Sequence, residues 1–342
     1  RGAIPGWLLP IFASIFILLA GSGIWFYEHE KERDLTAEAD QLVAVATLLN
    51  QQIVNWRQER YADGMILAEN SALISDIDRI IKNDQAANTT YVLERLRGYV
   101  THYRYHDAIL IDLNYNIYLS AKGRSKPLSG DIFSDIEKAG NTRKPVITDI
   151  HRSLASDKPY IDVVVPLYIG KDKRAKQVGT ILLQIDLDVF LYPTLEKWPL
   201  PSKTAEAFLT RQDGNDVLFL TELRFRKDSA LKLRLPSSEH EEPSVMATFG
   251  GKQGMVEGKS YDGLPVLAYI SKVPDSNWTL IAKIGREEAL ASWHFASKMI
   301  IAVTIGLLLA AAGIFGFIYQ SQGLQRLKES LGHLEAQQFT LA

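Results

Sequence analysis

The histidines are the first residues to consider for chemistry, because imidazole can act both as a metal ligand and as a general base. The sequence has seven histidines and no cysteine. His102 and His106 are four residues apart on an expected helix, but no carboxylate at ligand spacing completes a metal site. The absence of cysteine excludes disulfides, zinc–thiolate sites and cysteine nucleophiles. The sequence therefore predicts no metal centre.

Other patterns that would carry catalysis are also missing from the sequence. It contains no Gly-rich phosphate-binding loop and no Gly-x-Ser-x-Gly nucleophile elbow. Its 38 Lys and Arg nearly balance its 40 Asp and Glu, and the net charge of −2 argues against nucleic-acid binding. We therefore expect no catalytic residue, no cofactor and no nucleic-acid partner.

Two segments without any charged residue, 2–27 and 299–325, indicate a membrane protein. Each can supply the roughly 20 apolar helical residues that cross a hydrocarbon core about 30 Å thick. The first apolar stretch is longer than a signal-peptide core and no Ala-x-Ala site follows it, which favours an uncleaved span. Basic residues flank the pair at Arg1, Arg326 and Lys328. The positive-inside tendency then places both termini in the cytoplasm and residues 28–298 on the periplasmic side of the inner membrane.

A regular hydrophobic seam follows the first span. Residues 28–63 contain neither Gly nor Pro, and apolar residues recur alternately four and three positions apart at Leu35, Ala39, Leu42, Ala46, Leu49, Ile53 and Trp56. This heptad spacing predicts that the span continues as one long stalk helix. The seam could pack on the same helix of a second copy or on the chain's own domain, and the sequence leaves both alternatives open.

The period of the hydrophobic pattern then changes from that of a helix to that of strands. A helix start at Asn88 is followed by expected strands at 107–113, 116–121, 145–150, 160–169 and 178–187, with a short helix at 131–139. The pattern restarts with strands at 205–211, 217–223, 254–261, 265–273 and 278–284, and a helix at 243–249. The predicted fold class is α+β, with two tandem antiparallel-sheet lobes of one element order on a long N-terminal helix.

The C-terminal segment carries a second heptad pattern. Leucines fall on its a and d positions at Leu324, Leu327, Leu331, Leu334 and Leu341. We expect a short cytoplasmic coiled coil that connects to an output domain beyond Ala342.

The closing strands carry a family resemblance. Residues 261–269 (YDGLPVLAY) and 273–283 (VPDSNWTLIAK) look like the last strands of a membrane-proximal Cache lobe. The whole layout resembles the double-Cache (dCache) sensor receptors of bacteria and archaea, whose two lobes are PAS-like, and residues 188–249 are similar to the form found in sensors with a PAS domain after the second span. These motifs are structural, and we expect Trp278 to be a core anchor rather than a ligand stack.

The resemblance implies a division of the chain into seven segments. We expect a cytoplasmic N-terminus at 1–5, a transmembrane helix at 6–27, a stalk helix at 28–85, a membrane-distal lobe at 86–195, a membrane-proximal lobe at 196–290, a second transmembrane helix at 298–320 and the coiled-coil connector at 321–342.

The resemblance also implies a ligand pocket in the distal lobe, between the sheet and the loops that precede its last strands. That region supplies Tyr118, Arg124, His151, Arg152, Lys158, Tyr160, Asp162, Gln184 and Asp186. A small anion would use the basic residues, and an ammonium group would use Asp162 or Asp186. The Arg-x-Trp-Tyr cluster of the amino-acid-binding members is missing, and Gln184 stands where they carry an Asp. The resemblance therefore disfavours free amino acids as ligands.

Strand alternation gives the most specific expectation about this pocket. On the strand at 160–169, Tyr160, Asp162 and Val164 share one face, and the apolar residues between them share the other. The apolar set should face helices, and the set with a phenol and a carboxylate should line the pocket. Arg124, Arg152 or a ligand cation would then satisfy Asp162. The alternative is that this face is open to water and Asp162 is merely solvated.

The predicted function is that of the ligand-sensing and transmembrane signalling input module of a sensor histidine kinase. It would act as a homodimer, joined through the stalk helix, the spans and the coiled coil, with a small molecule as ligand. The same module would serve a PAS-containing diguanylate cyclase or a chemoreceptor equally well. A different alternative is a membrane scaffold whose ectodomain binds another protein. No catalytic domain is expected within these 342 residues.

Overall fold

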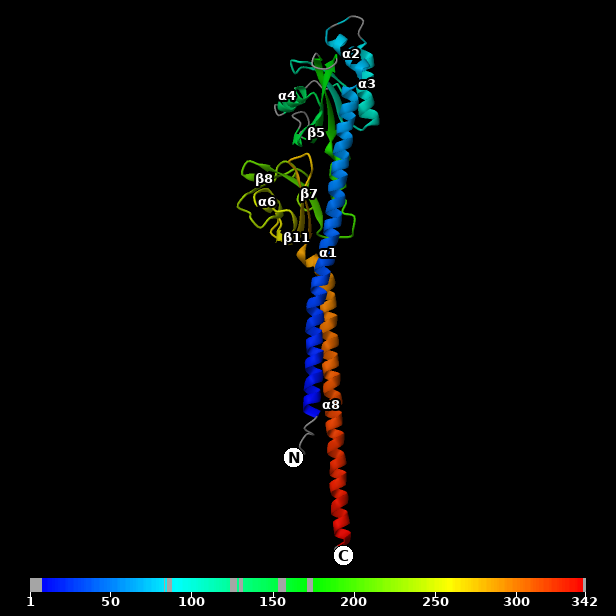
Figure 1. Cartoon of the computed structure of the whole chain (residues 1–342), viewed down its shortest axis with the longest axis vertical. Coiled ribbons are helices and arrows are strands. Elements are labelled where there is room, and N and C mark those ends of the chain that lie inside the picture. Colours follow the sequence, from blue (N-terminus) through cyan, green and yellow to red (C-terminus); the bar gives the residue numbers. More distant parts are fainter. Residues whose placement is uncertain are drawn as a thin grey trace. The chain divides into compact units, whose positions relative to one another are not determined.

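The structure is a computed structural model that describes residues 8–340 except 83, 85–87, 124–127, 129–131, 153–157 and 171–174. It divides into two compact units. Residues 1–40 and 286–342 form the helical unit, and residues 41–285 form the two-lobed unit. Helix α1 (Leu8–Ala68) contributes to both units (Figure 1).

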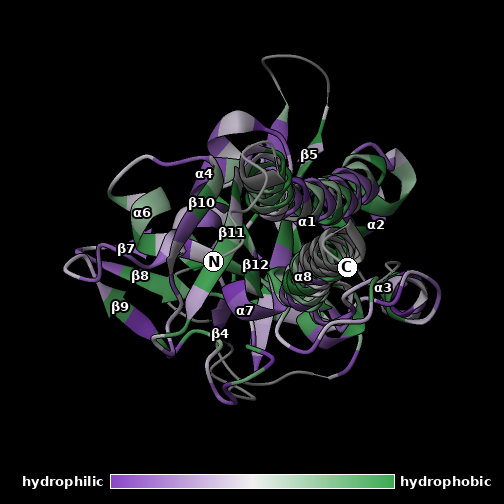
Figure 2. Cartoon of the chain, turned by 90° about the horizontal axis from the view of Figure 1, so that it is seen from below, coloured by the Kyte–Doolittle hydropathy of each residue, from purple (hydrophilic) through white to green (hydrophobic). Residues whose placement is uncertain are grey.

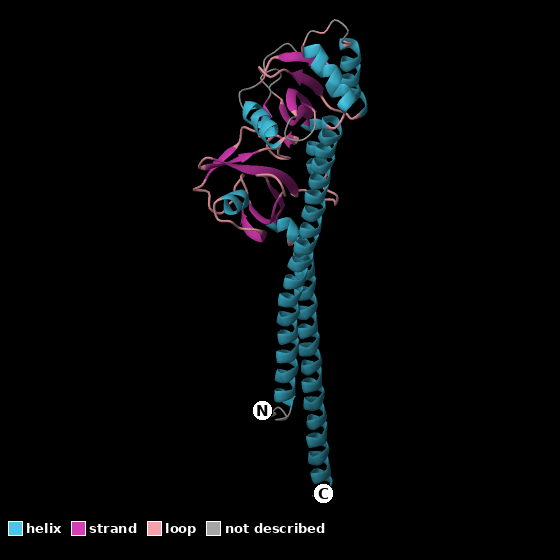
Figure 3. Ribbon diagram, turned by 45° about the horizontal axis from the view of Figure 1, so that its top comes forward, coloured by secondary structure: helices cyan, strands magenta, loops and turns pink. Residues whose placement is uncertain are grey.

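The helical unit pairs the first part of α1 with α8 (Ala291–Thr340), and the two helices lie side by side (Figure 3). They contain two segments, Pro10–Glu30 and Trp293–Ile318, that are long and apolar enough to cross a membrane. A Cβ atom at Gly23 would lie 2.9 Å from Thr304 Oγ1, so the lack of a side chain there permits close approach of the helices. Along the sequence, one apolar helical segment thus precedes the two-lobed unit and one follows it.

The first lobe, which keeps the name distal lobe from the sequence analysis, holds an antiparallel sheet of strand order β2-β1-β6-β5-β3, with β4 also paired to β5. Its strands are β1 (Asp107–Ile111), β2 (Ile117–Ser120), β3 (Val146–Ile147), β4 (His151–Arg152), β5 (Pro159–Ile169) and β6 (Lys176–Asp186). Its helices are α2 (Ser71–Ile81), α3 (Thr89–His102) and α4 (Ile132–Thr142).

Helices contact both faces of the distal sheet. On one face Ile132 and Ile136 of α4 pack in a buried cluster with Ile109, Val164 and Leu182. On the other face α2 packs against β5 and β6. The expectation that the face of β5 with Asp162 lines a pocket is therefore wrong for Val164, which shares that face and packs under α4.

The proximal lobe holds a second antiparallel sheet, of order β10-β11-β12-β7-β8-β9. Its strands are β7 (Glu206–Asp213), β8 (Asp216–Phe219), β9 (Arg234–Pro236), β10 (Gly254–Lys259), β11 (Pro265–Lys272) and β12 (Thr279–Gly285). Helix α6 (Pro243–Thr248) packs on this sheet over a core that includes Phe208, Ile270 and Ile281. The 3-10 turn η2 (Leu187–Val189) and α5 (Leu191–Glu196) connect the lobes, and α7 (Arg286–Ala289) follows β12.

The two sheets repeat one strand order, as the sequence predicted. The distal order β3-β5-β6-β1-β2 corresponds strand for strand to β10-β11-β12-β7-β8. Coloured by hydropathy, the proximal strands carry both hydrophobic and hydrophilic segments (Figure 2), as expected for sheets with a packed core and polar rims. Strand β9 is an addition that the sequence analysis missed.

The stalk differs from the prediction at its far end. Helix α1 ends at Ala68, and the Asn70 side chain accepts a hydrogen bond of 3.1 Å from the Leu73 amide, which starts α2. A single stalk helix over 28–85 is therefore wrong beyond residue 68, because an Asn N-cap begins a new helix there. The seam residues Leu42, Ala46, Leu49, Ile53 and Trp56 are buried within the chain itself. From Leu42 onward the seam thus packs on the chain's own lobes, whereas Ala39 is only partly buried and the side chain of Leu35 lies outside the described residues.

Two smaller expectations also fail. Helix α3 ends at His102, so His106 does not share it; the chain reverses at Arg104, whose φ of 60° lies in the left-handed region. Helix α4 continues through Gly140 to Thr142, although a helix end was expected at that glycine.

Candidate functional site

One face of the distal sheet changes from apolar to polar within two residues. Ile109, Leu182 and Val164 are register partners and belong to the core under α4. The next set of register partners on the same face is Asp107, Gln184 and Asp162, which we call the distal row. All three are buried, and Asp162 is only 2% exposed. The alternative of a merely solvated Asp162 is therefore wrong.

Asp162 is the least satisfied member of the distal row. Its Oδ2 lies 3.2 Å from His151 Nε2, and its backbone N–H donates to the Thr148 hydroxyl at 2.9 Å. Its Oδ1 is buried and has no hydrogen-bond partner among the described residues. A buried carboxylate oxygen without a donor is costly, so a hydrogen-bond donor placed beside it would stabilise the lobe.

His151 supplies the partner that the sequence analysis had sought in Arg124 or Arg152. Its second ring nitrogen, Nδ1, lies 3.1 Å from the backbone oxygen of Asp149. Both ring nitrogens therefore lie beside oxygen atoms. His151 thus connects the Asp162 carboxyl to the backbone at Asp149.

A wall of aromatic side chains adjoins the distal row. Tyr160 is 1% exposed, and its hydroxyl lies 3.4 Å from His106 Nε2, with the ring centroids 5.0 Å apart. Burial lowers the pKa of His106, and the nearby Lys122 ammonium lowers it further. His106 is therefore neutral at pH 7 and contributes an uncharged, amphipathic surface.

Asp107, by contrast, is fully satisfied within the chain. Its Oδ1 accepts from the backbone amides of Ala108 and Lys122 at 2.8 and 3.1 Å, and its Oδ2 accepts from the Ser120 hydroxyl at 2.8 Å. This carboxylate holds the start of β1 to the end of β2 and needs no ligand.

Four other predicted site residues have partners other than Asp162. Lys158 pairs with Asp188 at 3.1 Å and with Asp186 at 3.6 Å, and its side chain is half exposed. Arg152 donates to the backbone oxygen of Ala230 in the proximal lobe at 2.6 Å.

Tyr118 lies on the opposite side of the sheet, where its hydroxyl donates to the backbone oxygen of Ile80 in α2 at 2.8 Å. Arg124 lies outside the described residues. The candidates that the structure brings together are thus His151, Tyr160, Asp162 and Gln184.

The equivalent positions of the proximal lobe are filled differently. Glu206, Lys283 and Ala268 are register partners next to the core set of Phe208, Ile281 and Ile270, and we call them the proximal row. Lys283 Nζ lies 3.2 Å from Glu206 Oε2, and both side chains are almost fully buried. The proximal lobe therefore neutralises its buried carboxylate with its own ammonium group, and the distal lobe has no such group in its row.

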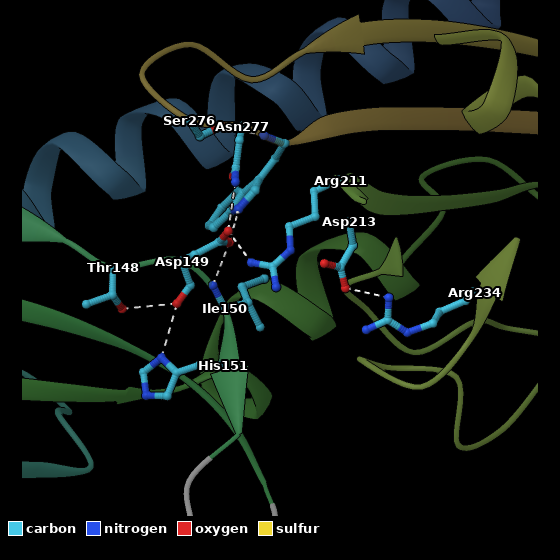
Figure 4. Close-up of polar contacts among 10 residues, drawn as sticks. Thr148, Asp149, Ile150, His151, Arg211, Asp213, Arg234, Ser276 and Asn277 are labelled. Carbon is cyan, nitrogen blue, oxygen red and sulfur yellow. Dashed lines mark hydrogen bonds and ion pairs between the residues drawn. The ribbon is translucent and has the colours of Figure 1, made fainter. Parts of the chain in front are cut away.

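Asp149 forms the centre of the lobe junction (Figure 4). It follows β3 of the distal lobe, and its carboxylate accepts hydrogen bonds from three proximal side chains. Trp278 Nε1 donates at 2.7 Å, Asn277 Nδ2 donates at 2.8 Å, and Arg211 forms the third bond and a salt bridge. Trp278 is a buried core anchor as predicted, and it also joins the lobes.

The charge of Asp149 makes this junction sensitive to acid. Burial alone would raise the pKa of Asp149, but the hydrogen bond from Trp278, the charge of Arg211 and the hydrogen bond from Asn277 together lower it below its ordinary value. A carboxyl with a lowered pKa stabilises the fold fully above its unfolded pKa of about 3.9, and the stabilisation is lost as pH falls through the folded pKa.

We therefore expect the stability difference between the wild type and Asp149→Asn to be largest near pH 7 and to shrink below about pH 4. Thermal unfolding of both proteins at pH 7, 5 and 3 measures this difference. An equal difference at pH 7 and pH 3 would show that the ionised carboxylate is not what stabilises the junction.

The sequence analysis missed Asp149 and the Glu206–Lys283 pair, and it considered His106 only as a possible metal ligand. Asp149 is one acidic residue in a short loop, and its partners Arg211 and Trp278 are 62 and 129 positions away. A charged residue inside an apolar strand was the available signal for Lys283, since burial of Lys requires a partner.

Comparison with known proteins supports the fold. No protein-family model and no curated protein matches the sequence. The solved ligand-binding domain of the Campylobacter jejuni chemoreceptor Tlp3, in complex with 4-methylisoleucine, is similar with a TM-score of 0.53 and 15% identity, over 76% of this chain and 93% of that one. The fold agrees with the double-Cache fold that the sequence resemblance predicted.

Two further solved domains are similar at lower scores. The ligand-binding domain of the Pseudomonas fluorescens chemoreceptor CtaA with L-isoleucine has a TM-score of 0.49 and 14% identity, over 77% of this chain and 98% of that one. The ligand-binding domain of the Pseudomonas aeruginosa PAO1 chemoreceptor PctB with L-Gln has a TM-score of 0.48 and 14% identity, over 74% of this chain and 93% of that one.

Proposed function

We propose that this chain is the ligand-sensing input module of a two-span transmembrane receptor, and that its distal lobe binds a small organic cation at Asp162. The observation that carries the proposal is the buried Asp162 Oδ1, which has no donor among the described residues. An ammonium group would supply both the missing hydrogen bond and the missing charge. Tyr160 and His106 would form the adjoining wall of the site.

The comparison of the two lobes supports a cation over an anion. The distal row carries two carboxylates and an amide, whereas the proximal row carries one carboxylate and an ammonium group. Even with His151 protonated, the buried distal row holds an excess of negative charge. A small anion placed there would add to this excess, and the basic candidates Arg152 and Lys158 already have partners elsewhere.

His151 supports a route from the site to the rest of the receptor. It contacts Asp162 through one ring nitrogen and the Asp149 backbone through the other, and the Asp149 side chain binds Trp278. Trp278 directly precedes β12, which continues through α7 into the second apolar helix. A ligand that moves His151 would therefore act on the residues that lead to that helix, in shifts of about 1–2 Å typical of such switches.

The output of the receptor is a further part of the proposal. A histidine kinase is the first candidate, with the chain as a homodimer in the inner membrane and its lobes in the periplasm. The spans and the coiled coil would join the two copies, because the stalk seam from Leu42 onward is buried within one chain. A chemoreceptor is the second candidate, because the solved domain of similar fold comes from the chemoreceptor Tlp3.

The test is a binding screen of the full chain in nanodiscs against small amines, matched neutral amides and organic acids, measured by calorimetry. We expect an amine to bind. The Asp162→Asn variant keeps the shape of the side chain and removes its charge, so it should lower the affinity for that amine by about tenfold or more, the scale of a charge-assisted hydrogen bond. Asp188→Asn removes the same charge at an exposed position and should leave the affinity unchanged. Binding of organic acids instead, or an Asp162→Asn affinity within about twofold of the wild type, would contradict the site.

A further inference from the structure

We propose that a cleft beside the lobe junction is a second ligand site, for a small organic dianion, and that Arg57 is its principal charged residue. The cleft has a volume of about 500 Å³, within the range that holds small organic molecules. One face of α1, the segment from α4 to β3 and the turn before β12 line it. This site goes beyond the proposed function, since it shares no residue with the Asp162 site.

Arg57 is held in place by an aromatic ring and a backbone oxygen. Its guanidinium lies over the Trp278 ring, 4.6 Å from the centroid, and Nη2 donates to the Asp275 backbone oxygen at 2.9 Å. Within the described part of the chain Arg57 forms no salt bridge. A guanidinium has five N–H donors in a planar fork, so most of them remain for a carboxylate or phosphate oxygen.

Partial burial of Arg57 strengthens its interaction with an anion. Desolvation lowers the pKa of Arg57, although the carboxylates of Asp149 and Asp275 act in the opposite direction. The guanidinium nevertheless stays protonated at neutral pH. A partly desolvated cation that lacks a close counterion binds an anion more strongly than an exposed one does.

Two lysines extend the positive charge along the cleft. Lys138 on α4 and Lys144 before β3 both line it and both are exposed. Neither forms a salt bridge with another described residue. Among the described lining residues there are three cations and one carboxylate, Asp275. The Asp149 carboxylate outside the lining also acts on Arg57, so the positive excess is largest at the two lysines. This excess favours a ligand with two negative charges over one with a single charge.

The apolar residues that line the cleft indicate the chemistry of the uncharged part of the ligand. Val54, Pro145, Val146 and Pro274 present apolar surface to the same cleft. The complementary molecule is therefore a dianion with a short hydrocarbon or aryl body, either a dicarboxylate or a phosphomonoester. Such a molecule would contact Arg57 on Trp278 and so bind directly at the junction that Asp149 forms.

The test uses the full chain in nanodiscs, titrated by calorimetry with glutarate, phthalate and phenyl phosphate, and with glutaramide as the uncharged control. We expect at least one dianion and not glutaramide to bind. Arg57→Gln should lower the affinity for that dianion by about tenfold or more, and Lys144→Gln should lower it severalfold, on the scale of charge-assisted hydrogen bonds. Whether dicarboxylates or the phosphomonoester bind more tightly identifies the ligand class.

Matched variants separate this site from other effects. Arg95→Gln and Lys176→Gln make the same changes at exposed positions outside the cleft and should leave binding unchanged. Asp162→Asn should also leave dianion binding unchanged. The proposal for the cleft and the proposal for the Asp162 site can therefore be rejected separately. Because Arg57 packs on Trp278 and its replacement could disturb folding, the exposed Lys144 provides the second test.

Two outcomes would overturn the proposal. One is that none of the three dianions binds, and the other is that binding is unaffected by both Arg57→Gln and Lys144→Gln. In the first case, a shift of the equilibrium between monomer and dimer by Lys144→Glu in sedimentation would show that the cleft is a contact between copies of the chain instead of a small-molecule site.

Discussion

Replacing Lys283 by Met is expected to lower the free energy of unfolding of the two-lobed unit by about 3–5 kcal/mol, because it leaves the buried Glu206 carboxylate without its charge partner. The side chains of Lys283 and Glu206 are 3% and 2% exposed, and their charged atoms are 3.2 Å apart. The Tyr261 hydroxyl still donates to Glu206 at 2.9 Å, but a neutral donor does not replace the charge. Chemical unfolding of the full chain in detergent, followed by tryptophan fluorescence, measures the loss.

Two control variants identify the cause. The double variant Glu206→Gln with Lys283→Met removes both charges, so we expect it to recover most of the lost stability. Lys259→Met breaks the exposed pair with Glu241 and should have no measurable effect. A double variant as unstable as Lys283→Met alone would show that the loss comes from packing and not from an unpaired charge.

Asp149→Ala is expected to cost about 2–4 kcal/mol, because it removes the shared acceptor of three proximal donors. The indole N–H of Trp278, the amide of Asn277 and the guanidinium of Arg211 would lose this partner together. Since these bonds join the distal lobe to the proximal one, we also expect unfolding to separate into two transitions. Differential scanning calorimetry detects both the loss and the separation.

The control for Asp149 is a nearby ion pair that joins no lobes. Asp213 and Arg234 pair on the surface of the proximal sheet (Figure 4), with side chains 37% and 48% exposed. Asp213→Ala should cost less than about 1 kcal/mol and leave a single transition. If Asp149→Ala were no more harmful than Asp213→Ala, the junction would owe its stability to apolar contacts.

Local patterns in the sequence predicted most of the fold. Alternation along β5 and β6 identified both strands, and Asp213-Gly214-Asn215 identified the hairpin of β7 and β8, where Gly214 has the φ of 64° that such turns require. The sequence analysis expected one strand at 145–150 and did not separate β3 from β4, because a strand of two residues has no measurable period. Their position is fixed by their pairing with β5.

The candidate site was only partly predictable, for a related reason. Alternation placed Tyr160 and Asp162 on one face, which depends on neighbouring residues alone. It could not show that His151 would pair with Asp162 or that Arg152 would bind Ala230, because these contacts depend on how β4 and the proximal lobe are placed. The charge difference between the rows became visible only when the registers of both sheets were known.

The strand order also determines when this chain can fold during its synthesis. In each sheet the first strand pairs with the last, β1 with β6 and β7 with β12, so neither sheet can close until its final strand has emerged from the ribosome. Helix α1 completes its packing even later, since the Asn50 side chain donates a hydrogen bond to the backbone oxygen of Lys272, 222 residues later. The apolar seam of α1 therefore stays uncovered through most of translation, which exposes it to aggregation. The yield of this protein should consequently depend on holding chaperones and on the rate of elongation.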